Sequence, residues 1–209
     1  MIPLLKRWFA GREPATQVRW VVVDCETSGL DVAHDRLLSV GAVAVRGGRI
    51  ELADAFSRLV RQGTPSDSAN ILVHGIGAQA QAAGEEAGRV IEDFAAYAGP
   101  GPLAAFHAPF DRAILERAAR EQGLHWRRRW LDIAELLAVL FPARAKRRRG
   151  LDEWLNEFGI AHGARHDALG DAFATAQLLQ VALEEARRHG FLSVHALLRA
   201  GESGRWAAQ

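Results

Sequence analysis

The stretch VVVDCETSGL, residues 21–30, begins as an apolar, β-branched run and ends in two acids and a polar loop. Three consecutive valines are typical of a buried β-strand. Asp24 and Glu26 follow, and side chains at positions i and i+2 of a strand project from the same face. Because two anions at the end of a buried strand are costly to remove from water, this spacing predicts a cation beside them. The alternative on spacing alone is that one acid caps a turn while the other faces water.

The rest of the chain adds strand and helix signals in an informative order. Residues 36–45 are expected to form a second strand, and residues 49–59 a third, because Gly47 and Gly48 supply a two-residue turn between them. The further expected elements are a helix within residues 84–98, a short strand at 103–106, and helices that begin near Pro109, Asp132, Leu151 and Ala168. This order predicts an α/β fold with a mixed sheet, an antiparallel meander plus parallel strands, flanked by helices on both faces.

Composition places the chain among ordinary globular proteins, with 209 residues, 49% hydrophobic and 24% charged. We expect an N-terminal tail at 1–17, one domain at 18–190 and a C-terminal tail at 191–209. A single cysteine, Cys25, excludes an intramolecular disulfide and fits a reducing compartment. The first apolar run is too short for a signal peptide, and no uncharged run is long enough to span a membrane, so a cytoplasmic location is expected.

Further acids and a histidine lie at candidate positions. Asp111 follows a predicted strand and falls in the first turn of a helix, where the alternative is a favourable charge at the helix N-terminus. His166 precedes Asp171 by five residues, which is about 140° around a helix axis. His166 is therefore expected on the loop before the helix, with Asp171 inside it; a surface or capping histidine is the alternative. Asp132, followed by Glu135, has the spacing of a capping box and is given a structural role.

Together, residues 24–30, the pair Phe110-Asp111 and the pair His166 and Asp171 resemble the three exonuclease motifs of the DEDDh (DnaQ-like) family. This family includes the proofreading epsilon subunit of bacterial DNA polymerase III. The similarity extends over residues 21–183, and residues 73–76 and 151–155 also resemble segments between the motifs. The resemblance implies an RNase H-like fold and a metal-dependent 3′→5′ exonuclease that releases nucleoside 5′-monophosphates.

The resemblance also implies a role for each matching residue. His166 would be the general base that takes a proton from the attacking water, a task that suits an imidazole with an ordinary pKa of about 6.5. Two Mg²⁺ or Mn²⁺ ions would be held by carboxylates, because hard divalent cations prefer oxygen ligands and a pair of ions can clamp a phosphodiester. The metal ligands implied, which complete the catalytic set, are Asp24, Glu26, Asp111 and Asp171.

Four side chains are implied as substrate contacts: Thr27, Leu30, His74 and Phe110. Leu30 and Phe110 would press on the terminal base and sugar, which holds a strand end without reading its sequence. For Phe110, ordinary core packing is the alternative.

The chain departs from the family pattern before the second motif. Phe106-His107 stands where many members carry His-Asn. This leaves the metal ligands intact but removes whatever contact the family's asparagine makes, with a consequence for substrate preference.

Two basic runs are further candidates for nucleic-acid contact. Residues 127–129 lie between two tryptophans, and residues 144–149 precede the third motif. The alternative for either run is a solvated face. If the second run holds the phosphate backbone, binding should weaken steeply with salt.

Three functions are compatible with these residues. The first is a DNA exonuclease that acts on single strands or frayed 3′ ends, alone or as the proofreading partner of a DNA polymerase or a repair protein. The second is an exoribonuclease or oligoribonuclease of the same fold, because two-metal chemistry works on either sugar and no group here reads the 2′-OH. The third is a catalytically silent nucleic-acid-binding module, which the presence of all five catalytic residues disfavours.

Overall fold

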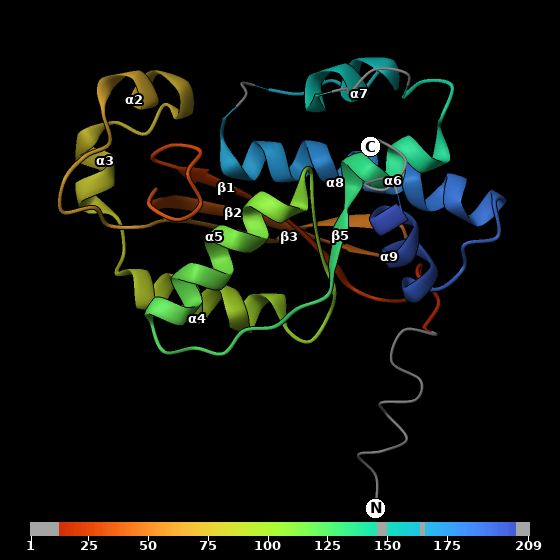
Figure 1. Ribbon diagram of the computed structural model, residues 1–209, viewed down its shortest axis with the longest axis horizontal. Helices are drawn as coiled ribbons and strands as arrows, with labels where there is room; N and C mark the ends of the chain where they lie inside the picture. Colours follow the sequence, from red (N-terminus) through yellow and green to blue (C-terminus); the bar gives the residue numbers. More distant parts are fainter. Residues whose placement is uncertain (1–12, 146–149, 164–165, 204–209) are drawn as a thin grey trace, which may run out of the picture.

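The computed structural model describes residues 13–145, 150–163 and 166–203, and five strands in these ranges form one mixed sheet (Figure 1). The strands are β1 (Trp20–Thr27), β2 (Leu37–Arg46), β3 (Arg49–Leu59), β4 (Leu103–Ala105) and β5 (Trp130–Asp132). Their order across the sheet is β3-β2-β1-β4-β5. Neighbouring strands are antiparallel from β1 to β3, whereas β4 and β5 run parallel to β1. The predicted mixed sheet is confirmed.

Helices cover both faces of this sheet (Figure 1). The described helices are α2 (Ser68–His74), α3 (Ala78–Ala83), α4 (Ala87–Ala98), α5 (Ala108–Glu121), α6 (Ile133–Leu140), α7 (Leu151–Glu157), α8 (Ala168–Arg188) and α9 (Val194–Ser203). Side chains of α4 and α5 form one buried cluster with one face of the sheet, and side chains of α6 to α9 form a second cluster with the other face. In the described ranges, no helix is both long and apolar enough to cross a membrane.

Both ends of the described chain pack against the body of the protein. The backbone amide of Ala15 donates to the carbonyl of Leu192 at 2.9 Å, and the amide of Val194 donates to the carbonyl of Glu13 at 3.1 Å. Val194 and Leu197, three residues apart on α9, are fully buried, and α9 lies against α6 and β5. The segment predicted as a C-terminal tail, 191–209, therefore contains a packed helix. The domain limits at 18 and 190 stay a prediction.

Three short elements differ from the sequence-based expectation. The sequence predicts no element where the structure has the helices α2 and α3 and the strand β5, because elements of three to seven residues carry little periodicity. The predicted cap of α6 is confirmed: the carboxylate of Asp132 accepts a hydrogen bond from the amide of Glu135 at 3.3 Å.

Candidate active site

The alternation of side chains along β1 places two acids on one face of the sheet. Trp20 and Val22 belong to the buried cluster on the α8 side, whereas Val21 belongs to the cluster on the α5 side. Continuing this alternation puts Asp24 and Glu26 on the α8 side. Glu26 is only 8% exposed. The predicted co-facing pair therefore exists, at the C-terminal end of a central strand.

The first turn of α8 brings a third acid to the same end of β1. The carboxylate of Asp167 caps the helix by accepting a hydrogen bond from the amide of Gly170 at 2.9 Å. Asp171, one turn inside the helix, is 5% exposed, and its Oδ2 accepts the backbone N–H of His166 at 3.0 Å. This hydrogen bond fixes the loop at His166 to Asp171 of α8.

Gly41 explains how α8 comes so close to the sheet. This residue lies on β2 directly opposite Asp24. A Cβ atom at this position would lie 2.2 Å from backbone atoms of Ala168 and Leu169, far inside van der Waals contact. The absence of a side chain at Gly41 is therefore what permits the start of α8 to rest on the strand next to β1.

Glu26, His166 and Asp171 form a group that could hold a metal ion. One ligand atom from each lies within 4.8 Å of the others. Both acids are buried, whereas His166 is exposed and has a positive φ of 65°. Two carboxylates beside an imidazole match the ligand types that divalent cations take in proteins, so the donor set fits such an ion.

The fourth acid reaches β1 from the opposite face. Asp111 lies in the first turn of α5, directly after β4, and its Oδ1 accepts the backbone N–H of Cys25 at 3.0 Å. It is 4% exposed, and this burial raises its pKa to about 7. Burial, and next the charge of Asp111, also raises the pKa of the Cys25 thiol. A carboxyl group so poorly hydrated gains stability from any bound cation.

A cavity of about 340 Å³ opens beside two of the acids. Its lining residues are Asp24, Cys25, Phe106, His107, Phe110, Asp111, Gly150 and Leu151. Asp24 shares this cavity with Asp111, and on β1 it is two residues from Glu26, which belongs to the group with His166 and Asp171. All five residues predicted as catalytic therefore lie around the C-terminal end of β1.

The residues predicted to contact substrate lie in different environments. Leu30 is 87% exposed on the loop after β1. The Thr27 hydroxyl donates to the carbonyl of Gly29 at 2.6 Å, which shapes that loop. Phe110 is partly buried against the core on the α5 side, as the core-packing alternative predicts. It also lines the cavity, so part of its ring is available to a ligand there.

His74 is buried with both ring nitrogens in contact with protein groups. Its Nδ1 accepts the amide N–H of Ile76 at 3.0 Å, which leaves Nε2 to carry the proton and donate to Ser66 Oγ at 3.2 Å. Burial lowers the pKa of His74, and the nearby His166 lowers it further. Protein groups therefore engage both ring nitrogens.

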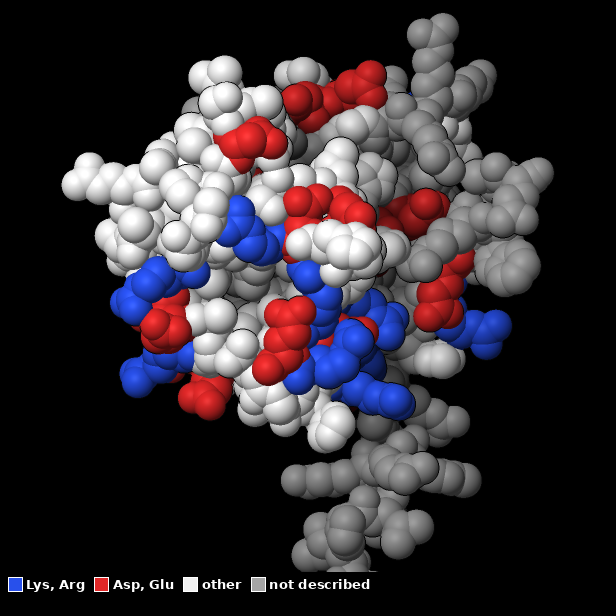
Figure 2. Space-filling view, turned by 60° about the vertical axis from the view of Figure 1, so that its left-hand side comes forward, with Lys and Arg blue, Asp and Glu red and all other residues white. Residues whose placement is uncertain are grey.

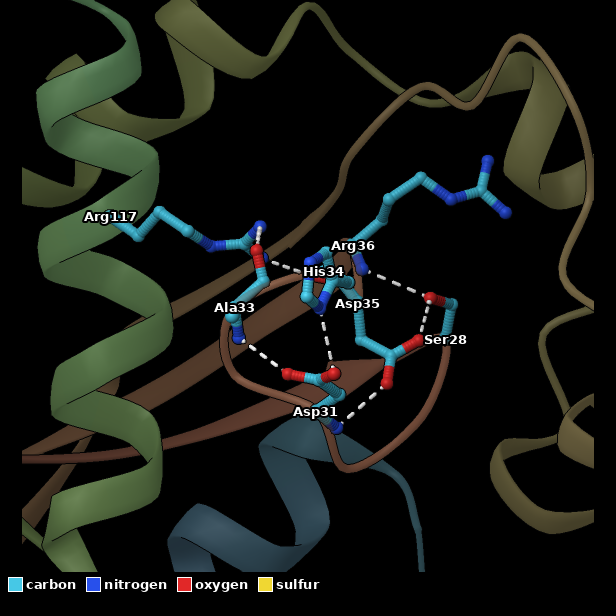
Figure 3. A network of polar contacts seen from close by, with 7 residues as sticks. All are labelled: Ser28, Asp31, Ala33, His34, Asp35, Arg36 and Arg117. Carbon is cyan, nitrogen blue, oxygen red and sulfur yellow. Dashed lines mark hydrogen bonds and ion pairs between the residues drawn. The ribbon is translucent and has the colours of Figure 1, made fainter.

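Sequence reasoning missed a polar network in the loop between β1 and β2 (Figure 3). The carboxylate of Asp35 accepts hydrogen bonds from Ser28 Oγ at 2.8 Å and from the amide of Asp31 at 2.7 Å. Ser28 Oγ in turn accepts the amide N–H of Arg36 at 2.9 Å, and Asn70 of α2 donates to the carbonyl of Ser28. Closely spaced Ser and Asp residues are the signal that could have revealed it, because these side chains bond to nearby backbone in turns.

The first basic run lies away from the acids. Trp130, directly after residues 127–129, is level with Leu103, and Leu103 is level with Val21 at the start of β1. Because β1, β4 and β5 are parallel, the run lies at the opposite end of the sheet from Glu26. The second run is only partly described, since residues 146–149 lie outside the described ranges. On the face shown in Figure 2, basic and acidic side chains are interspersed.

Comparison with known proteins identifies related sequences. The exonuclease family model RNase T matches residues 21–179. A DNA polymerase III subunit epsilon-like protein of Rhodobacter capsulatus is 32% identical over 188 residues, which is 88% of this chain but 26% of that protein. The chain therefore spans about a quarter of the length of this relative.

Solved structures share the fold. Escherichia coli Exonuclease I in complex with a dT13 oligonucleotide superposes with a TM-score of 0.72 at 17% identity, over 83% of this chain and 43% of that chain. Exonuclease X in complex with 5′ overhanging duplex DNA superposes with a TM-score of 0.65 at 21% identity, over 87% of this chain and 99% of that chain. The predicted RNase H-like fold is confirmed.

Proposed function

Because the chain belongs to the RNase T exonuclease family, we propose that it is a 3′→5′ exonuclease that releases nucleoside 5′-monophosphates from single-stranded or frayed DNA. The observation that carries this proposal is the convergence of separate segments at one end of β1. Asp24 and Glu26 come from the strand, Asp111 comes from α5, and Asp171 with His166 comes from the start of α8. Acids from such distant segments of the chain are expected to converge only where they share a ligand.

The carboxylates of this group suit a pair of divalent cations. We assign Asp24, Glu26, Asp111 and Asp171 as the residues that would hold two Mg²⁺ or Mn²⁺ ions. The desolvation of Asp111, visible in its raised pKa, supports this assignment, because a bound cation would offset it. Bound there, the ions would neutralise the charge that develops on the phosphate and on the leaving oxygen.

His166 would accept the proton of the attacking water. The imidazole is exposed at the edge of the acid group, and its backbone N–H donates to Asp171, which fixes the position of the loop. As the water oxygen bonds to phosphorus, its proton would pass to the imidazole, and the bond from phosphorus to the 3′ oxygen of the preceding nucleotide would break, with that oxygen taking up a proton from solvent. The products are a nucleoside 5′-monophosphate and a strand shortened by one residue.

The remaining residues would hold the strand end. Leu30 would press its exposed side chain on the terminal base, and Phe110 would contact the sugar from the cavity wall. Thr27 would support this contact through the shape of the loop that carries Leu30. His74, with both nitrogens engaged, would act by fixing the end of α2 beside the site.

Degradation of end-labelled strands tests the proposed activity. The protein with Mg²⁺ is given 5′-labelled DNA and RNA oligonucleotides of one sequence, and we expect stepwise shortening of the DNA from its 3′ end. Shortening of RNA alone would replace the proposal by an exoribonuclease, and binding without cleavage of either strand would replace it by a binding module. Asp24→Asn should be inactive, whereas Asp93→Asn, an exposed acid paired with Arg89 on α4, should keep full activity.

The role of His166 has its own test. His166→Ala should lower kcat by about 10²- to 10⁴-fold, the usual contribution of a positioned general base. Titration with Mn²⁺ should show cation affinity close to that of the wild type. His195→Ala, which removes an exposed histidine on α9, is the matched control. A fully active His166→Ala would remove this residue from the mechanism.

Proofreading for a DNA polymerase is the cellular role that we assign to this activity. The polymerase III name of the Rhodobacter capsulatus relative supports it. A primer with a mismatched 3′ terminus should be shortened faster than a fully paired primer, because the enzyme needs a frayed end. Equal rates on the two primers would contradict this role without affecting the proposed chemistry.

A further inference from the structure

Two histidines have an unusual backbone conformation. In the part of the chain that the structure describes, His107 and His166 are the residues other than glycine with a positive φ, at 59° and 65°. An L-amino acid in this left-handed region is strained, and such strain is concentrated at functional sites. His166 already belongs to the proposed machinery. His107, at the start of α5, has no part in it.

The side chain of His107 has no structural task that requires a histidine. It occupies the N-cap position of α5 but makes no capping hydrogen bond. Its ring is exposed and lies edge-on to Phe106, with 4.7 Å between ring centroids. Within the described residues, the imidazole makes no hydrogen bond or ion pair. Glycine or asparagine would adopt this backbone conformation more readily.

His107 is distinctive in the cavity beside Asp24 and Asp111. The other lining side chains are these two acids, a buried cysteine and apolar groups. The backbone N–H of Gly150, which also lines the cavity, already donates to Glu153 at 2.8 Å. Phosphate oxygens only accept hydrogen bonds, so an N–H donor in this cavity suits a strand that crosses it. Among the side chains that line it, the imidazole of His107 is the one that offers a nitrogen-bound proton.

We propose that this cavity is a subsite for a phosphate of the substrate strand, and that His107 donates its imidazole N–H to a non-scissile phosphate oxygen there. The inference rests on the proposed exonuclease function and adds to it the contact that positions the strand next to the acids. Because this contact is to a linkage that does not react, it is made equally in the ground state and the transition state. Its loss should therefore change KM and leave kcat nearly unchanged.

Substitutions that keep the backbone conformation isolate the imidazole. His107→Gly removes the donor at a position where glycine is unstrained, so the thermal midpoint should not fall. We expect KM for a 5′-labelled DNA oligonucleotide to rise about 10-fold, the effect of a lost hydrogen bond to a charged group, with kcat within about twofold of the wild type. His107→Asn keeps a shorter donor and should give an intermediate KM. His125→Gly, which removes an exposed histidine before the first basic run, should leave KM unchanged.

A modified substrate locates the contact. A methylphosphonate at the second or third linkage from the 3′ end removes one charged oxygen without touching the scissile bond. At one of these positions the methylphosphonate should raise KM for the wild-type protein. It should not raise KM for His107→Gly above the value for the unmodified strand, because both changes delete the same hydrogen bond. A purely structural role for His107 would give no such coupling.

The outcomes separate the two proposals. An inactive wild-type protein would overturn the exonuclease function itself. An active wild-type protein whose KM is unaffected by His107→Gly would overturn the phosphate subsite and leave the exonuclease function standing. Additive effects of His107→Gly and the methylphosphonate at both linkages would overturn the subsite as well.

Discussion

Two groups of acids in this chain have opposite electrostatic environments. In the loop after β1, the exposed Asp31 and the half-buried Asp35 accept hydrogen bonds from residues within eight positions in sequence. The hydrogen bond from His34 lowers the pKa of Asp31. Asp111 is buried beside β1, and burial raises its pKa to about 7. The same chemical group is thus stabilised as an anion in one region and destabilised in the other.

The difference separates acids that stabilise a local loop conformation from acids that the packing of distant segments brings together. The loop network is built from its own neighbours and stabilises a local conformation (Figure 3). The acids around the C-terminal end of β1 are held in place by the packing of the sheet, α5 and α8, and their proximity works against folding unless a cation neutralises them.

The largest effect is expected from Asp171→Asn. Loss of one of the four proposed metal ligands would remove several kcal/mol of charge stabilisation, so kcat on a 5′-labelled DNA strand should fall by on the order of 10³-fold. Asp35→Asn removes an acid of the loop network and should keep kcat within about threefold. Equal loss in both variants would show that the two groups of acids do not differ in role.

Protein stability should depend on pH through Asp111. Its pKa in the folded protein, about 7, exceeds the ordinary value of 3.8, so the folded state binds the extra proton between these pH values. Stability of the metal-free protein should therefore fall as the pH rises from about 4 to 7, by up to roughly 4 kcal/mol. Urea unfolding in EDTA at pH 5 and at pH 7.5 covers about two of these three pH units, so a fall of roughly 3 kcal/mol is expected between the two measurements.

Asp111→Asn should flatten the pH dependence and make the metal-free protein more stable at pH 7.5, because the amide carries no charge to desolvate. Asp31→Asn is the matched change in the loop and should leave the slope between pH 5 and 7.5 as in the wild type. A slope that persists in Asp111→Asn would assign the pH dependence to another group.

Much of the acid group could be predicted because its signals are local. The alternation along β1 fixes the face of Asp24 and Glu26, and the cap at Asp167 fixes where α8 begins and hence where Asp171 lies. Strands and helices longer than about ten residues repeat their periodicity often enough to be recognised. The exposed position of His166 on the loop before α8 follows from the same boundary.

Features that depend on contacts between distant segments could not be read from the sequence. Gly41 looks like any glycine in a strand until α8 is placed on it, and α9 looks like a tail until its apolar residues meet α6 and β5. The basic run at 127–129 is equally ambiguous, because only the register of β5 shows that it lies far from Glu26. The engagement of both His74 nitrogens likewise depends on partners brought together by the fold.

Gly41→Ala probes the packing that gathers the acids. The added methyl group would meet the backbone of Ala168 at 2.2 Å, so the start of α8 must move away from β2. A displacement of about 1 Å at a reacting centre can cost about 10²-fold in rate, and the overpacking should cost about 1–3 kcal/mol of stability. Gly63→Ala, at a glycine with open space around it, should change neither quantity. Wild-type kcat in Gly41→Ala would show that the approach of α8 does not control the position of Asp171.

The smallest effect is expected in the loop network, from Ser28→Ala. The Ser28 hydroxyl donates to Asp35 and accepts the amide N–H of Arg36, so its removal deletes two hydrogen bonds of a half-exposed loop. Each is worth about 1 kcal/mol or less there, and the unfolding free energy should fall by about 1 kcal/mol, measured in urea with Ser57→Ala as the exposed control. Because this loop carries Leu30, KM should rise a few-fold while kcat stays unchanged. A change in kcat as large as that of Asp171→Asn would mean that the loop takes part in the chemistry. The contrast between the acids of the loop network and the acids at the end of β1 would then no longer hold.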